Sequence, residues 1–243
     1  MKEGVFIMKY LNETLSTQLN HRTIRKFKNE QLPKELVDTL LEVARHTATS
    51  TGAQASSIIR VTDQNLKNEL ANLCGQEFIA SIPELMIFIV DNFRNYQIAK
   101  EKGVENPTGM YLSQFFQSHI DAAITAQNVV VAAESLGLGT VYLGCILGEI
   151  EKVCELLKLP QYTFPVVGLG IGYPDQDPGL KPKMDMSLRV FENEYKVFPN
   201  YLEAIKEYDV IMKDYYMSRD TNSRIDSFST QIATRLSQPV SQK

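Results

Sequence analysis

Two short basic segments carry the residue types best suited to hold an anion. The first, His21–Phe27, reads His-Arg-Thr-Ile-Arg-Lys-Phe, and the second, Lys181-Pro182-Lys183, lies far along the chain. Arginine offers a fork of N–H donors and lysine a compact positive charge, so both recognise phosphate groups. We therefore predict that the two segments grip one phosphate group from distant parts of a single fold. Two solvated surface turns are the alternative that the same residues allow.

The chain does not match the sequence motifs of common nucleotide-binding sites, hydrolases or metal sites. Gly168–Tyr173 has a glycine one place too early for a dinucleotide-binding fingerprint. Gly139–Gly144 has the spacing of a phosphate-binding loop, but Cys145-Ile146 stands where Lys-Ser/Thr is required. The chain has no Gly-x-Ser-x-Gly segment, and its histidines and cysteines have no metal-ligand spacing. The sequence argues against a hydrolase and against a metal site.

The composition is that of an ordinary globular protein. The chain has 243 residues, 44% of them hydrophobic, which is long enough for a substantial core. Its 25 basic and 29 acidic residues give a net charge of −4, which argues against nucleic acid as a partner. The three cysteines lack paired spacing, and the apolar patch near the N-terminus is too short for a signal peptide. We therefore expect a cytoplasmic protein.

The longest helical pattern covers Tyr111–Leu136, and its downstream half is apolar on nearly every side. Polar residues such as Asp121 and Glu134 interrupt the apolar stretch, which argues against a membrane span. A helix without a polar face is surrounded by protein, and part of that cover can come from a second subunit. We predict a homodimer with this helix near the interface.

Helices and strands alternate along the chain without a long linker or an internal repeat. The unbroken apolar run Leu85–Val90 predicts a strand at the centre of a sheet. Further strands are expected at 58–62, 140–143 and 164–170, and helices at 33–46, 66–73, 149–157 and after Tyr201, with a polar amphipathic segment to about Leu236. The alternation indicates one α/β domain with an extended C-terminal arm.

Five segments, in order along the chain, match motifs of one known family. They are His21–Phe27, Ser56–Asp63, Ala132–Gly139, Tyr142–Gly144 and Gly172–Lys183. Together they resemble the oxygen-insensitive, NADPH-dependent nitroreductase and flavin reductase family, over about residues 12–230. The resemblance implies an FMN-bound homodimer with an α+β, nitroreductase-like fold, in which helices wrap a central mixed sheet and residues 1–243 form a single FMN-binding domain.

The resemblance also implies which residues contact FMN. Those at the phosphate and ribityl chain would be His21, Arg22, Thr23 and Arg25, joined by Lys181 and Lys183. Those lining the flavin ring would be Thr49, Thr51 and Gln54, then Gln76, Glu77 and Phe78, then Tyr142, Leu143, Gly144 and Cys145. Lys181 would stabilise negative charge at the N1/O2 edge of the ring. Core packing is an equal alternative for Tyr142, and plain surface exposure for Gln76.

The activity implied by the resemblance is that of an FMN-dependent NAD(P)H oxidoreductase. Two electrons would pass by a ping-pong hydride mechanism to nitroaromatics, quinones or related acceptors. Because the flavin carries this chemistry, the protein needs no metal and no nucleophile of its own. The alternatives are a flavin reductase that supplies free reduced FMN and, from a different class, a flavin-binding redox-sensing module with poor turnover. Small molecules, and neither nucleic acid nor membrane, are the expected partners.

The chain departs from the family pattern in three places. Gly52-Ala53 stands where relatives often have bulkier residues, and Cys145 stands where they often have a second glycine. We expect these changes to affect the flavin pocket. Arg219 and Arg224 match positions for the NADPH phosphate, but the basic residues that follow in relatives are missing. The sequence leaves open the choice between NADPH and NADH and the physiological acceptor.

Overall fold

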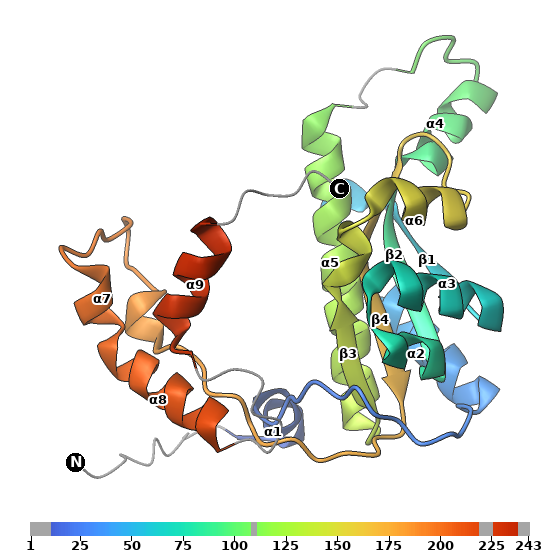
Figure 1. The fold of residues 1–243 in the computed structure, drawn as a ribbon. Coiled ribbons are helices and arrows are strands. Elements are labelled where there is room, and N and C mark those ends of the chain that lie inside the picture. Colours follow the sequence, from blue (N-terminus) through green and yellow to red (C-terminus); the bar gives the residue numbers. More distant parts are fainter. Residues whose placement is uncertain (1–10, 108–110, 219–225, 238–243) are drawn as a thin grey trace. The chain divides into compact units, whose positions relative to one another are not determined.

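The computed structural model describes residues 11–107, 111–218 and 226–237 (Figure 1). The chain divides into two compact units, residues 1–178 and residues 179–243. The basic segment His21–Phe27 belongs to the first unit, whereas Lys181 and Lys183 belong to the second. A single domain over residues 1–243 stays a prediction.

A four-stranded sheet forms the centre of the described part of the first unit, in the order β1-β2-β4-β3. The strands are β1 (Ser56–Val61), β2 (Glu84–Asp91), β3 (Gly139–Leu143) and β4 (Thr163–Gly172). All four pair antiparallel. The expected mixed sheet is therefore corrected: among the described residues, parallel pairing is confined to an isolated bridge between Thr23 and Thr140. Strand β2 lies inside the sheet, as its apolar run predicted.

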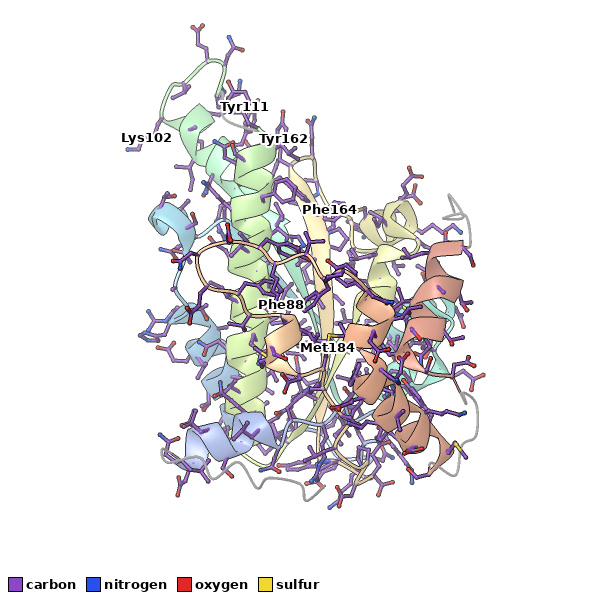
Figure 2. All side chains as sticks on the ribbon, turned by 90° about the vertical axis from the view of Figure 1, so that its left-hand side faces the viewer. Phe88, Lys102, Tyr111, Tyr162, Phe164 and Met184 are labelled. Carbon is purple, nitrogen blue, oxygen red and sulfur yellow. The ribbon has the colours of Figure 1, made fainter. Side chains whose placement is uncertain are left out.

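The alternating side chains of β2 supply both faces of the core, which explains its unbroken apolar sequence. Met86, Phe88 and Val90 pack with α2 (Lys34–Arg45) and α5 (Leu112–Ser135). Figure 2 labels Phe88 and Phe164, which both belong to this layer. Leu85, Ile87 and Ile89, which alternate with these residues on β2, pack on the other face of the sheet. Their neighbours there are α3 (Gln64–Cys74), the 3₁₀ helix η2 (Glu77–Ser81) and α6 (Ile150–Leu156).

Helix α5 runs alongside the sheet and has two apolar faces of different character (Figure 1). Its inner face is fully buried and consists of Ala122, Ala126, Val129, Val130 and Ala133. A second row at four-residue spacing stays exposed: Leu112 by 69%, Phe116 and Ile120 by 56% and Ile124 by 39%. In the described part of the chain, no helix is both long and apolar enough to cross a membrane.

Two helices escaped the sequence analysis because neither has an apolar stripe that reaches the core. Helix α1 (Glu13–Leu19) begins at Asn12, whose side chain accepts a hydrogen bond of 2.9 Å from the backbone N–H of Leu15. Helix α4 (Asn92–Glu101) is capped in the same way by Asp91, at 3.1 Å from the backbone nitrogen of Arg94. Neither helix has a buried residue. The caps are the local signals that start these helices.

The second unit is mainly helical in its described part. It contains η4 (Met186–Leu188), α7 (Tyr201–Ala204), α8 (Lys206–Met217) and α9 (Phe228–Ser237). Asp209 of α8 accepts hydrogen bonds from both the backbone N–H and the hydroxyl of Ser229, at the start of α9. The rings of Tyr208 and Phe228 lie 5.3 Å apart at the same junction. The helices expected beyond Tyr201 are therefore present.

Gly139, at the start of β3, should not tolerate a larger side chain. A Cβ added there would lie 2.7 Å from Cγ1 and 2.8 Å from Cβ of the buried Ile24. We expect Gly139→Ala to lower the free energy of unfolding by about 1–3 kcal/mol in urea denaturation, because the core would be overpacked. Gly144→Ala is the matched control, since a Cβ there meets nothing within 4 Å. Equal stability of both variants would contradict the tight contact between Ile24 and β3.

Candidate functional site

The first basic segment is fixed as an extended chain between β3 and the residues that follow β4. The backbone N–H of Ile24 donates to the carbonyl of Thr140 at 2.8 Å, and that of Lys28 donates to Tyr173 at 2.9 Å. The side chain of Ile24 is buried, whereas Arg25 is exposed. Because side chains alternate along an extended chain, anchoring Ile24 in the core directs its neighbours outward. The sheet thus positions the cations.

A carboxylate at the end of α5 gathers the polar side chains near this segment. Oε1 of Glu134 lies 2.7 Å from Nδ1 of His21 and 2.6 Å from the hydroxyl oxygen of the buried Thr140. A carboxylate only accepts, so Nδ1 of His21 donates to it, which leaves Nε2 for another partner. Sequence analysis included Glu134 in a family motif but gave it no role. Its function as an acceptor becomes visible only in the fold.

Arg22 has donor capacity that the described residues do not use. One terminal nitrogen lies 2.6 Å from a carboxylate oxygen of Asp177, but Nε is buried and has no hydrogen-bond partner in the described part of the chain. An unpaired buried N–H is costly unless a ligand or water completes it. Arg22, Glu134 and Asp177 line a pocket of about 510 Å³, together with Ser16, Thr17, Asn20 and Ile24.

The end of β3 carries the next group of predicted flavin contacts. The hydroxyl of Tyr142 donates to Oε1 of Gln127 on α5, at 3.1 Å. Burial, and then the negative charge of Glu134, raises the pKa of Tyr142 to about 12, so this phenol stays a neutral donor. Leu143 is buried, while Gly144 is exposed at the start of the 3₁₀ helix η3 (Gly144–Leu147). The hydrogen-bond acceptor of Tyr142, Gln127, and the charge that acts on it, Glu134, both belong to α5.

The predicted loop Gln76–Phe78 and this turn pack against the same core layer. Cys74, the last residue of α3, and Cys145 in η3 are both partly buried against the cluster that contains Leu143. Phe78 is half-buried against the same core layer, and Glu77 is exposed. The structure therefore brings residues 74–78 and 142–145 together, although they are far apart in sequence.

The predicted residues Thr49, Thr51 and Gln54 form a separate group. Their loop is held by α5 and α4: Asp121 accepts from the backbone N–H of Ser50 at 2.8 Å, and Arg94 donates to the carbonyl of Gln54. The loop lines pockets of about 610 and 440 Å³ that share no lining residue with the pocket at Arg22. Asp121 and Glu134 are 13 residues apart on α5, or about 20 Å along its axis.

The remaining predicted residues lie in the second unit or outside the described residues. Lys181 and Lys183 are exposed, and Nζ of Lys181 lies 5.7 Å from the ring centroid of Tyr216. Arg219 and Arg224 fall outside the described residues. Among the residues that are described, no group of three or more His, Cys, Asp or Glu side chains could hold a metal ion.

Comparisons with known proteins identify the family. The profile of the nitroreductase family matches residues 19–173, and that of the nitroreductase family C-terminal domain matches residues 181–243. The chain belongs to the nitroreductase family. The family recognised in the sequence is thereby confirmed, and so is the α+β, nitroreductase-like fold.

Three relatives illustrate how far the similarity of this nitroreductase extends. It is 38% identical to an FMN reductase (NADPH) of Bacillus subtilis (strain 168), over 94% of this chain and 93% of that protein. It is 37% identical to an oxygen-insensitive NADPH nitroreductase of Salmonella typhimurium, over 93% of this chain and 92% of that protein. The solved NADPH:FMN oxidoreductase from Vibrio harveyi, complexed with NAD+, matches with a TM-score of 0.83 and 33% identity, over 94% of this chain and 93% of that one.

Removal of the Glu134 carboxylate should destabilise this nitroreductase. Glu134→Ala leaves the buried hydroxyl of Thr140 and the Nδ1–H of His21 without their acceptor. We expect a loss of about 1–3 kcal/mol in the free energy of unfolding, measured by urea denaturation. Glu134→Gln keeps an acceptor oxygen and should lose less. Glu69→Ala, at an exposed position of α3, is the control, and an equal loss in all three variants would contradict the cluster.

Proposed function

We propose that this nitroreductase is an FMN-dependent NAD(P)H oxidoreductase that passes electron pairs to nitroaromatics, quinones or related small acceptors. The observation that carries the proposal is the unsatisfied Nε of Arg22 at the pocket of about 510 Å³, in a chain of this family. When bound, FMN supplies the two-electron hydride chemistry, with NADPH or NADH as co-substrate. The names of the relatives, FMN reductase (NADPH) and NADPH nitroreductase, support this activity.

The residues at the pocket fit a phosphate monoester. Arg22 offers its unpaired Nε, His21 offers Nε2, and the side chain of Arg25 is exposed without a hydrogen bond or ion pair among the described residues. Asp177 neutralises part of Arg22, but its side chain is 84% exposed. Such an exposed ion pair contributes little free energy, so an incoming phosphate can displace it. These residues would hold the FMN phosphate, with Thr23 at the ribityl chain.

The flavin ring would lie against the turn at the end of β3. Gly144 is exposed there, and a Cβ added to it would meet nothing within 4 Å, so the backbone is open to a planar ligand. Tyr142 is held in place by Gln127 and keeps its proton, because its pKa is raised to about 12. Gln76 and Phe78 would border the same space. That Lys181 and Lys183 also contact FMN stays a prediction from the family resemblance.

The charge of Arg25 should be needed to hold FMN. Arg25→Ala removes one charged hydrogen bond to phosphate, worth about 1.5–3 kcal/mol, and should weaken FMN binding roughly ten- to hundredfold. Titration of flavin-free protein with FMN, followed by flavin fluorescence, measures the change. Lys28→Ala is the matched control, because Lys28 is a basic, exposed neighbour outside the proposed site. Unchanged affinity in Arg25→Ala would contradict the phosphate assignment.

We also propose that the protein is a homodimer whose subunits share each flavin site. The residues expected around one flavin form two groups that are attached to α5 about 20 Å apart. The exposed apolar row on α5, from Leu112 to Ile124, is too extensive to be ordinary solvent-facing surface. Packing this row against a second copy would bury it and would bring the Thr49–Gln54 loop of one subunit toward the pocket of the other.

The three unpaired cysteines support a cytoplasmic location.

A shared site predicts complementation between two defective variants. Arg25→Ala impairs the phosphate group of residues, and Thr51→Ala combined with Gln54→Ala impairs the loop. If each flavin contacts both subunits, mixed dimers contain one site with neither defect. We expect NADPH oxidation with a nitrofuran acceptor to recover after the two proteins are unfolded and refolded together. Refolding each variant alone is the control, and mixtures no more active than the parents would contradict a shared site.

A flavin reductase is the second candidate function. The relative from Bacillus subtilis is named an FMN reductase, and one from Vibrio harveyi is named an NADPH-flavin oxidoreductase. In that role free FMN would be the acceptor. Comparing kcat/KM for free FMN with that for nitrofurans and quinones separates the two functions.

A further inference from the structure

The imidazole ring of His21 is held by a carboxylate that is itself fixed in the fold. Oε1 of Glu134 lies 2.7 Å from Nδ1 of His21 and accepts a hydrogen bond of 2.6 Å from the hydroxyl of Thr140. Thr140 is buried in β3, and the side chain of Glu134 is only 12% exposed. If the carboxylate turned away, it would leave a buried hydroxyl unpaired, which is costly. Glu134 therefore fixes the orientation of the His21 ring.

The same contact decides which nitrogen of His21 carries a proton when the ring is neutral. A carboxylate only accepts hydrogen bonds, so the proton is on Nδ1, and Nε2 then presents a lone pair. A fully ionised phosphate monoester also only accepts. A neutral His21 and a phosphate group would therefore meet as two acceptors. Nε2 can donate to the phosphate only when the ring carries protons on both nitrogens.

The charges around the pocket of about 510 Å³ lead to the same conclusion. Of the described residues that line it, Arg22 is basic, whereas Glu134 and Asp177 are acidic. The lining residues from α1 and its C-terminal end carry no charge; they are Ser16, Thr17 and Asn20. Both carboxylates repel a phosphate dianion unless a further positive charge lies beside them. A doubly protonated His21, next to Glu134, supplies that charge.

We propose that Glu134 is a positioning residue that makes FMN binding depend on the protonation of His21. If His21 contacts the FMN phosphate, as in the proposed function on which this rests, one proton lies between Nε2 and a phosphate oxygen in the complex. A histidine ring ordinarily loses its second proton at about pH 6.5, and a free phosphate monoester loses its own at about pH 6. At higher pH the separated partners hold neither proton, so binding takes one up from the solvent. FMN affinity is therefore highest near about pH 6.5 and falls as the pH rises.

Titration of flavin-free protein with FMN and with riboflavin, between about pH 6.5 and about pH 8.5, tests the proton linkage. Riboflavin has the same ring and ribityl chain but no phosphate, so a proton taken up for the phosphate affects FMN alone. We expect the Kd for FMN, measured by flavin fluorescence, to rise about tenfold over this range, because a charged hydrogen bond is lost. The Kd for riboflavin should stay constant.

Two variants assign the dependence to the pair of side chains. His21→Gln keeps a neutral donor and removes the titrating ring, so its Kd for FMN should be the same at both ends of the pH range. Glu134→Gln keeps the size of the side chain but removes the charge beside the ring, so its Kd for FMN should begin to rise at a lower pH than that of the wild type. Glu69→Gln, at an exposed position of α3, is the matched control and should follow the wild-type profile.

Nuclear magnetic resonance of flavin-free protein with isotope-labelled histidine reads the protonated nitrogen directly. The signals of His21 are those that His21→Gln lacks, and they should show the proton on Nδ1 in the neutral ring. A neutral ring protonated on Nε2 would overturn the role of Glu134. Far-ultraviolet circular dichroism and thermal melting show whether each variant is folded. Where Glu134→Gln is not, His21→Gln and the wild-type spectra still decide the outcome.

The failure of this proposal is distinct from the failure of the proposed function. A Kd for FMN that is constant with pH, or that changes in parallel with the Kd for riboflavin, would overturn the proton linkage and leave FMN as the ligand. The same holds for identical pH profiles of the wild type and His21→Gln. Failure of the wild-type protein to bind FMN at any pH would instead overturn the proposed function.

Discussion

The site depends on the docking of one extended segment against the edge of a sheet. Ile24 is fixed to β3 by its backbone hydrogen bond to Thr140 and by burial of its side chain against Gly139. Because Gly139 has no Cβ, the segment lies close to the strand. Any other residue at position 139 would force the segment away from it. Arg22 and Arg25 flank this anchor, so the positions of the cations follow from a packing contact between two apolar neighbours. Ion pairs of Arg22 with Asp177 and of Lys26 with Asp175 add contacts between the segment and the residues that follow β4.

Helix α5 is the second organising element, because it accepts hydrogen bonds from three separate segments of the first unit that bear on the proposed site. Its end supplies Glu134 to His21 and Thr140, its middle supplies Gln127 to Tyr142, and an earlier turn supplies Asp121 to the loop at Ser50. These polar residues are the ones that made a membrane span implausible from sequence. The fold uses each of them as a hydrogen-bond acceptor for a segment outside α5. A single helix thus helps to fix the spacing between segments that are distant in sequence.

The sequence predicted those parts of the fold whose pattern is set by burial. The apolar run at β2 and the long pattern at α5 each reflect contact with the core on more than one side, so both elements were placed correctly. Helices α1 and α4 were not predicted, because their formation depends on caps and not on an apolar stripe. The described strands pair antiparallel where a mixed sheet was expected, because a resemblance carries topology only in outline, while pairing direction is set by the connections.

For the site, the sequence motifs indicated which residues to consider but not which of them contact one another. Sequence position could not show that Glu134 serves two donors or that Asp177 already pairs with Arg22. These contacts arise where segments far apart in the chain converge, and no local pattern encodes them. The same reason explains why the loop at Thr49–Gln54 was grouped with the other flavin contacts, although within one chain it lies apart from them.

The loop between α2 and β1 has a backbone conformation that is unfavourable for two of its residues. Thr51 and Gln54 both adopt left-handed conformations, with φ of 52° and 48°, which cost free energy for residues other than glycine. The contacts that hold this shape come from outside: Asp121 at Ser50, Asn95 at the carbonyl of Ala53 and Arg94 at that of Gln54. Since the scaffold sets the shape, the loop's exposed side chains are free to change during evolution without refolding the loop. Changes of these side chains would alter the pockets that the loop lines and leave its backbone in place.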